Sequence, residues 1–268
     1  MATTRMALED LPATVLAVIS EHTGPVQKIE SVAEGFNSEI AVRVFSELGG
    51  CYVKGLRKDH RRVWTQRREA EVNPFVRGIA PALLWREERE GWDLLAFEAL
   101  DGHHADYSAG SADLPKVADA LVRLGEVACP DIELRHAEQR LEQYAASPGD
   151  LDYFTGDSLL HTDLNNANVL VDVTAHLVDW AWATRGAAWL DAGYWVIWLI
   201  AAGGHDPASA EQWAARVPAW QSAPIAGVTA FALANANVWD EIGGAAPNDW
   251  TARMMDASHR WARYRTTV

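Results

Sequence analysis

The segment from Leu160 to Asp179 constrains the fold of this chain more than any other. It reads LHTDLNNANVLV and, after a short turn, LVDW. Two short apolar runs with a turn between them predict two strands joined as a hairpin. Asp163 and Asn168 lie in the polar loop before the first strand, and Asp179 directly follows the second. Pairing of the two strands would bring Asn168 and Asp179 to the same edge.

Phosphoryl transfer needs side chains of these types. The reaction needs positioning and charge neutralisation more than covalent help from the protein. A carboxylate must orient the accepting hydroxyl and take its proton, and Asp163 can do so. Magnesium prefers oxygen ligands, which the amide of Asn168 and the carboxylate of Asp179 supply. A lone HxD is weak evidence, but HxDxxxxN followed by strand, turn, strand and Asp is specific.

The segment resembles the catalytic core of the aminoglycoside phosphotransferase family, which is related to choline kinase and to the protein kinases. The resemblance implies an α+β, bilobal, protein-kinase-like fold with a small antiparallel-sheet lobe and a larger, mostly helical lobe. It implies that Asp163 is the catalytic base and that Asn168 and Asp179 bind Mg²⁺. By the same resemblance, His161 and Asp191 support the catalytic loop. No APE-like activation segment follows Asp179, which disfavours a protein kinase.

Two positions depart from the family pattern. Thr162 stands where the family usually has Gly, and Asn166 stands where many members carry Pro or Gly. Both lie between the chemically important residues, so we expect changes in loop shape and substrate fit rather than in chemistry.

The remaining sequence fits two lobes, at residues 1–99 and 100–268. Apolar patterning predicts the following elements. In the first lobe they are a helix over 7–22, strands over 26–32, 39–45, 51–56, 82–86 and 92–97, and a helix over 59–76. In the second lobe they are a hairpin over 169–179 and helices over 114–127, 132–144, 190–201, 208–216, 225–242 and 249–264.

Residues of the first lobe are expected to bind the nucleotide, ATP or GTP. Lys54 lies within a predicted strand and matches the lysine that contacts the α- and β-phosphates in kinases. Glu69 and Glu71 are both candidates for its carboxylate partner, and the resemblance favours Glu69. The resemblance assigns six further nucleotide-binding positions: Asn37, Ser38, Glu98, Leu100, Leu170 and Val178.

Composition limits the partners and the location. The 268 residues carry a net charge of −14, and no Lys/Arg cluster resembles a nucleic-acid-binding face. An acidic surface suits a cationic substrate, but it also keeps proteins soluble. Without a signal-like N-terminus or a long apolar run, we expect a cytoplasmic monomer or homodimer that binds no nucleic acid and no membrane.

The sequence indicates the reaction more closely than it indicates the molecule that accepts the phosphoryl group. We expect an O-phosphotransferase that acts on a small-molecule antibiotic, of the aminoglycoside or nucleoside type, as a resistance enzyme. A metabolic kinase for choline, homoserine or a sugar-like acceptor is the alternative, followed by a nucleotide-binding pseudokinase. Acidic side chains would hold an aminoglycoside, and tryptophans would stack on a nucleoside. The named candidates are Trp180, Trp198, Asp240 and Glu241.

Overall fold

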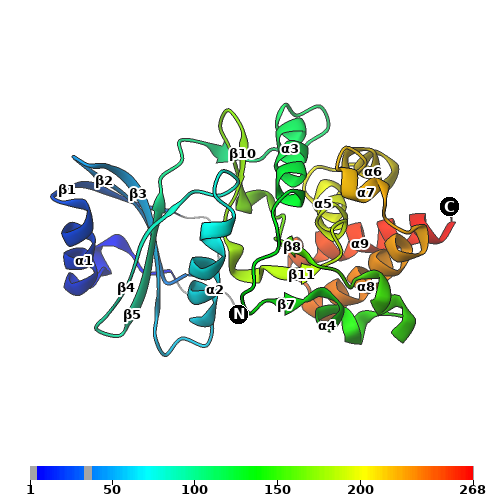
Figure 1. Cartoon of the computed structure of the whole chain (residues 1–268), viewed down its shortest axis with the longest axis horizontal. Coiled ribbons are helices and arrows are strands. Elements are labelled where there is room, and N and C mark those ends of the chain that lie inside the picture. Colours follow the sequence, from blue (N-terminus) through cyan, green and yellow to red (C-terminus); the bar gives the residue numbers. More distant parts are fainter. Residues whose placement is uncertain (1–4, 33–37, 268) are drawn as a thin grey trace. The chain divides into compact units, whose positions relative to one another are not determined.

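The computed structural model describes residues 5–32 and 38–267, which form two compact units (Figure 1). One unit comprises Met1–Gly102 together with Val178–Ala181, and the other comprises His103–Leu177 and Trp182–Val268. The chain therefore passes between the units three times. The expectation of one boundary after residue 99 did not include the return of Val178–Ala181 to the first unit.

A five-stranded antiparallel sheet forms the centre of the first unit, with strand order β1-β2-β3-β5-β4. Its strands are β1 (Val26–Ser31), β2 (Ile40–Ser46), β3 (Gly49–Arg57), β4 (Leu83–Arg89) and β5 (Trp92–Glu98). Glu90 and Gly91 join β4 to β5, and both have positive φ, at 45° and 84°. Two left-handed residues in a two-residue loop match the right-handed twist of a hairpin.

The two helices of the first unit cover opposite faces of this sheet (Figure 1). Helix α1 (Ala13–Thr23) packs Val15, Val18 and Ile19 against strand residues such as Val53. Side chains alternate between the faces of a strand, so the neighbour of Val53, Lys54, points to the other face. Helix α2 (Trp64–Val72) lies there.

The predicted helix over 59–76 is longer than the α-helix that forms. Residues 59–63 form turns, and a 3₁₀ turn, Asn73–Phe75, contains Pro74 and follows α2. The buried positions of α2 are Thr65, Gln66, Glu69 and Val72, while Phe75 is 45% exposed. The inner face of α2 is thus mostly polar, because Gln66 and Glu69 find partners inside the unit.

The second unit combines two small sheets with most of the helices. One sheet has the order β10-β9-β6 and the other β7-β11-β8. The strands are β6 (His103–His104), β7 (Arg135–His136), β8 (Ser158–Leu160), β9 (Val169–Val171), β10 (Ala175–Leu177) and β11 (Thr184–Gly186). The longer helices are α3 (Asp113–Gly125), α5 (Leu190–Ala201), α6 (Pro207–Ala214), α8 (Ile225–Gly243) and α9 (Asp249–Thr267).

The predicted helix over 132–144 is wrong for most of its length. The segment contains strand β7, a five-residue helix α4 (Ala137–Leu141) and a 3₁₀ turn, Glu142–Tyr144. Strand β7 pairs in parallel with β11, so Arg135 and His136 are held by tertiary pairing rather than by local propensity. A local pattern cannot detect such a pairing.

Aromatic residues dominate the core of the second unit. The Phe231 ring contacts Trp189 at 5.5 Å and Trp261 at 6.0 Å between ring centroids. Trp195 and Trp261 are fully buried. Most of the tryptophans after residue 180 thus serve packing, as their large apolar area favours. No helix within 5–32 or 38–267 is long and apolar enough to cross a membrane.

Candidate active site

Lys54 is buried in the first unit, on the α2 side of strand β3. Its ammonium group forms an ion pair with Glu69 of α2 and lies 3.4 Å from Asp179 Oδ1. Burial works to lower the pKa of Lys54, but the carboxylates of Asp179 and Glu69 outweigh it, so the pKa is raised. The lysine therefore stays charged.

Glu69 rather than Glu71 is the partner of Lys54. Burial raises the pKa of Glu69 to about 7, although the ammonium group of Lys54 opposes the rise. Glu71 is partly exposed and pairs with Arg67, one turn earlier on the same helix. The periodicity of α2 accounts for this outcome, because Glu69 shares its face with the buried Gln66 and Val72.

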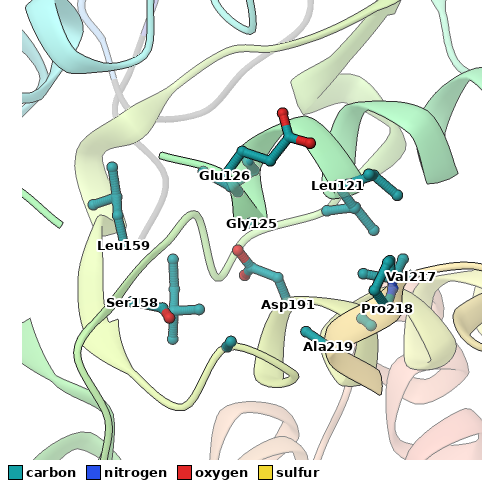
Figure 2. Close-up of a pocket in the computed structure, with 14 residues that line it drawn as sticks. Leu121, Gly125, Glu126, Ser158, Leu159, Asp191, Val217, Pro218 and Ala219 are labelled. Atoms are coloured by element: carbon teal, nitrogen blue, oxygen red, sulfur yellow. The ribbon is translucent and has the colours of Figure 1, made fainter. Parts of the chain in front are cut away.

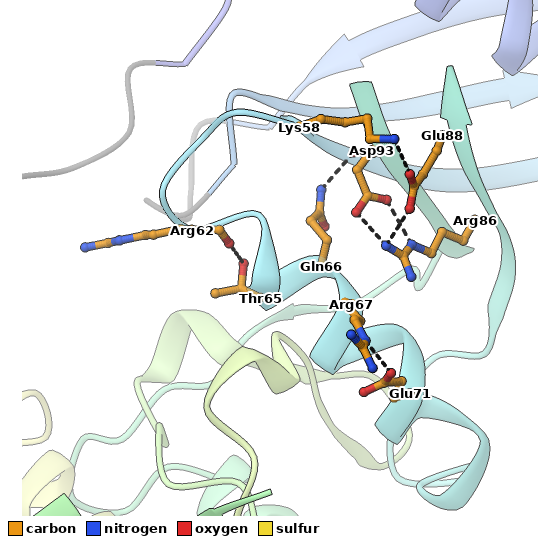
Figure 3. A network of polar contacts seen from close by, with 9 residues as sticks. All are labelled: Lys58, Arg62, Thr65, Gln66, Arg67, Glu71, Arg86, Glu88 and Asp93. Carbon is orange, nitrogen blue, oxygen red and sulfur yellow. Dashed lines mark hydrogen bonds and ion pairs between the residues drawn. The ribbon is translucent and has the colours of Figure 1, made fainter. Parts of the chain in front are cut away.

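A polar network fixes α2 on the sheet (Figure 3). The Gln66 side chain donates to the Asp93 carbonyl oxygen of β5 at 3.1 Å. The Asp93 carboxylate in turn accepts two hydrogen bonds from Arg86, at 2.9 and 2.8 Å. Such bidentate pairs are geometrically specific. Because Gln66 lies three residues before Glu69, this anchor sets the height of Glu69 against the sheet.

Asp179 follows β10 by two residues and has an unusual backbone. Its φ is 62°, in the left-handed region, which Asp tolerates better than most residues. Its side chain is 18% exposed, against 6% for Glu69, so this carboxylate stays accessible while also facing Lys54. An accessible carboxylate beside a buried lysine can bind a cation without losing its protein partner.

The loop that carries Asp163 belongs to the second unit, and hydrogen bonds to Asp191 hold its backbone in place. The Asp191 carboxylate accepts the backbone N–H groups of His161 and Thr162, both at 2.8 Å. Burial raises the pKa of Asp191 to about 6, and the two N–H groups oppose the rise. His161 is fully buried, and its Nδ1 accepts from the Asp163 N–H at 3.3 Å. Asp163 itself is half-buried.

Asn168 ends the same loop and directly precedes β9. Its amide nitrogen donates to the Asp163 carbonyl oxygen at 3.3 Å, which directs the amide oxygen away from that carbonyl. By donor chemistry each of Asn168, in the second unit, and Asp179, in the first, fits magnesium, because the ion takes hard oxygen donors such as an amide oxygen or a carboxylate. No group of three or more His, Cys, Asp or Glu residues suited to a metal ion occurs in the described part of the chain.

Thr162 stands where the family usually has glycine, and its contacts show how a threonine is accommodated at this position. Its φ is 65°, where a β-branched residue is strained by roughly 1–3 kcal/mol. The departure from glycine is visible in the sequence, but Arg140, whose guanidinium group donates to the Thr162 hydroxyl, was not among the predicted site residues. Tyr107, whose hydroxyl group donates to the Leu164 carbonyl oxygen at 3.0 Å, was not predicted either. Both contacts span more than twenty residues, so no local pattern signals them.

The remaining nucleotide-binding candidates are spread over both units. Asn37 lies outside the described residues, and Ser38 is buried just before β2. The Glu98 N–H donates to the Ala82 carbonyl oxygen, and the Leu100 carbonyl oxygen accepts from Arg43 at 3.0 Å. Leu170 lies in β9 and is half-buried, as is Val178 next to Asp179.

Of the four acceptor candidates, Trp198, Asp240 and Glu241 lie on helices of the second unit. Trp198 of α5 contacts Trp239 of α8 and Trp250 of α9, at 6.4 and 6.1 Å between ring centroids. Asp240 follows Trp239 and pairs with His259 at 2.8 Å. Glu241 is exposed and accepts from Gln143 at 3.4 Å. Trp180 belongs to the first unit and is only 1% exposed.

A cavity of about 280 Å³ lies in the second unit (Figure 2). Side chains of α3, β8 and the start of α7 (Pro218–Gln221) line it, most of them apolar. Asp191 is the one predicted site residue in its wall. The cavity therefore borders Asp191, which holds the loop, while Asp163 and Asn168 are not among its lining residues.

No protein-family model matches this chain, and no curated protein matches it. Solved structures do match its fold. Choline kinase LicA from Streptococcus pneumoniae is 11% identical, with a TM-score of 0.63, and the match covers 94% of this chain and 100% of that chain. LicA in complex with AMP, also 11% identical, has a TM-score of 0.59, covering 94% of this chain and 98% of that chain.

A second kind of kinase matches equally well. A thermostable mutant of aminoglycoside phosphotransferase APH(4)-Ia, in a ternary complex with AMP-PNP and hygromycin B, is 14% identical with a TM-score of 0.62. The match covers 94% of this chain and 98% of that chain. At such identities a likeness establishes the fold. The chain has the kinase-like fold of choline kinase LicA and aminoglycoside phosphotransferase APH(4)-Ia, as the segment from Leu160 to Asp179 predicts.

Proposed function

We propose that this protein is a magnesium-dependent O-phosphotransferase, which moves the γ-phosphoryl group of ATP or GTP to a hydroxyl group of a small molecule. The observation that carries the proposal is the buried Lys54–Glu69 ion pair beside Asp179. Burying a lysine and a glutamate is costly, and an apolar pair of similar size would stabilise the fold as well or better. The retention of these charges is understood if Lys54 contacts phosphate groups.

The residues of the site divide the work of the reaction. The Asp163 carboxylate orients the acceptor hydroxyl and takes its proton as the oxygen attacks the γ-phosphorus. The bond from that phosphorus to the bridging oxygen breaks, and the nucleoside diphosphate leaves with that oxygen. Lys54 neutralises charge on the α- and β-phosphates. Asn168 and Asp179 would hold magnesium, which supplies further neutralisation of the phosphate charge.

We infer that the acceptor is an antibiotic of the aminoglycoside or nucleoside type. Two observations support this finer assignment. Acidic and aromatic candidates occur together on the helices of the second unit, since Asp240 directly follows Trp239, which contacts Trp198. APH(4)-Ia, a protein of the same fold, has been captured with hygromycin B. Carboxylates attract the ammonium groups of an aminoglycoside, and indole rings stack on flat rings or sugar faces.

Two alternatives remain distinct from this proposal. A metabolic kinase would use the same chemistry on a simple acceptor, and LicA, of the same fold, is a choline kinase. A pseudokinase would bind nucleotide without turnover. The presence of Lys54, Asp163, Asn168 and Asp179 together disfavours it, because each has a separate part in transfer.

The decisive experiment is mass spectrometry of an acceptor panel incubated with protein, magnesium and either ATP or GTP. The panel spans aminoglycosides, nucleoside antibiotics, choline and homoserine. One compound should gain a single phosphoryl group. Modification of choline or homoserine alone would replace the antibiotic assignment by the metabolic one.

The matched control is Asp163→Asn, which keeps the size of the side chain but removes the base. We expect turnover to fall by about 10²- to 10⁴-fold while nucleotide binding, measured by calorimetry, persists. Wild-type turnover in this variant would exclude Asp163 as the base. Nucleotide binding without any phosphorylated product in the wild type would favour the pseudokinase.

A further inference from the structure

Thr162 is held in a backbone conformation that its side chain disfavours. Its φ of 65° suits glycine, which has no Cβ to clash with the neighbouring carbonyl group. Thr162 directly precedes Asp163, so its backbone angles fix the direction in which the Asp163 carboxylate leaves the chain. Asp191 secures only the N–H group of Thr162. A second constraint is needed to keep a β-branched residue there.

Arg140 of α4 supplies that constraint. Its Nη1 atom donates to the Thr162 hydroxyl oxygen at 2.7 Å and to the Thr184 hydroxyl oxygen at 2.6 Å. The Thr162 hydroxyl then donates to the Trp182 carbonyl oxygen at 3.0 Å. The side chain of Thr162 is thus bonded both as acceptor and as donor, and 7% of the residue is exposed. Hydrogen bonds from a charged donor are stronger than neutral ones.

The same network reaches the chain that follows Asp179. Trp182 lies three residues after Asp179, and its carbonyl oxygen also accepts from the Thr184 hydroxyl at 2.8 Å. Strand β11 places Thr184 opposite Leu160, two residues before Thr162. One guanidinium group therefore joins the start of the Asp163 loop to the end of the segment that contains Asp179.

We propose that Arg140 is a positioning residue, which holds the Asp163 loop in its working conformation through the hydroxyl group of Thr162. The inference rests on the proposed phosphotransferase function for its kinetic readout. It assigns Arg140 no contact with nucleotide or acceptor. Glycine at position 162 would need no such support, so the arginine and the threonine form one functional unit.

The test is a double-mutant cycle of Arg140→Met and Thr162→Gly. Arg140→Met should lower kcat by about 10- to 100-fold, the range expected for a small misplacement of a reacting group, with each KM within about threefold of wild type. In the Thr162→Gly background the same change should lower kcat by less than about threefold, because glycine adopts the required φ unaided. An equal loss in both backgrounds, or no loss in the wild-type background, would overturn the proposal.

Three further variants control for general damage to the fold. Thr162→Ala keeps the strain but removes the hydroxyl group, so it should reproduce the loss seen in Arg140→Met. Thr162→Ser keeps the hydroxyl group and should stay within about threefold of wild type. Arg185→Met removes the arginine of β11 next to Thr184, whose side chain donates to the Pro130 carbonyl oxygen, and should leave kcat unchanged. If Thr162→Ala matches Thr162→Ser, the hydroxyl bond has no positioning role.

Amide hydrogen exchange tests the inference without any activity. Arg140→Met should speed exchange within residues 161–168, and the effect should shrink in the Thr162→Gly background. Unchanged exchange in Arg140→Met would overturn the inference even in an active enzyme. Absence of turnover on every acceptor, with the exchange result as expected, would instead reject the proposed function and leave the positioning role of Arg140 standing.

Discussion

The two units stabilise a buried carboxylate in opposite ways. In the first unit, Glu69 is neutralised by another full charge, the ammonium group of Lys54. In the second unit, Asp191 is held by two backbone N–H dipoles, from His161 and Thr162. The ion pair keeps a full positive charge on Lys54, which the proposed function uses to bind phosphate, whereas the two N–H groups at Asp191 only fix the backbone of a loop. Two buried carboxylates can therefore serve different purposes, one by holding a charge and the other by holding the chain.

The largest expected effect breaks the ion pair. Glu69→Ala leaves Lys54 buried with Asp179 as its remaining carboxylate partner in the described part of the chain, and removing one partner of a buried pair costs about 3–5 kcal/mol. Replacing both, as Lys54→Met with Glu69→Leu, should recover most of that loss but none of the activity. Urea unfolding of the single and double variants measures the loss of stability and its recovery, and a phosphorylation assay measures the activity. A double variant no more stable than Glu69→Ala would show that the destabilisation does not come from the unpaired charge of Lys54.

An intermediate effect concerns the pH dependence of Asp191. Its folded pKa of about 6 lies above the ordinary 3.8, so the folded protein binds more protons between these values. The free energy of unfolding attributable to Asp191 should therefore fall as the pH rises from about 4 to 6, by on the order of 2–3 kcal/mol. Subtracting the curve of Asp191→Asn isolates this contribution. A difference that stays constant with pH would contradict the raised pKa.

The smallest expected change in stability comes from Asp179→Asn. Asparagine tolerates the φ of 62° as aspartate does, so the free energy of unfolding should change by less than about 1 kcal/mol. The lost charge should instead reduce the gain in nucleotide affinity on adding magnesium by about tenfold or more. Calorimetry with and without magnesium measures that gain. An unchanged gain would remove Asp179 from the metal site.

The sequence predicted well those features that depend on short-range patterns. The sequence predicts the hairpin of β9 and β10 and the polar loop before it, because two short apolar runs and the turn between them lie within twenty residues. Helix α5 matches its predicted bounds of 190–201, because its apolar residues fill a whole helix. The kinase-like fold is confirmed by the structural matches.

Features that depend on distant contacts could not be predicted from the sequence. Arg140 lies in a segment whose apolar spacing suggested one helix from residue 132, but pairing of β7 with β11 delays the start of that helix to Ala137. Its contacts span 22 residues to Thr162 and 44 to Thr184. Gln66 resembles a solvent-facing residue until its partner on β5 is known, whereas the family resemblance, and not a local pattern, favoured Glu69 as the partner of Lys54. Buried polar residues are revealed by their partners, not by their own chemistry.

The three crossings of the chain between the units limit how such a protein can be divided. A gene fragment encoding residues 103–268 would include Val178–Ala181 but lack the sheet on which that segment packs. A fragment ending at Gly102 would retain Lys54 and Glu69 but lose the carboxylate of Asp179. Neither half is therefore a transferable module, and recombination at Gly102 would exchange sheets only between chains whose segments equivalent to Val178–Ala181 also match.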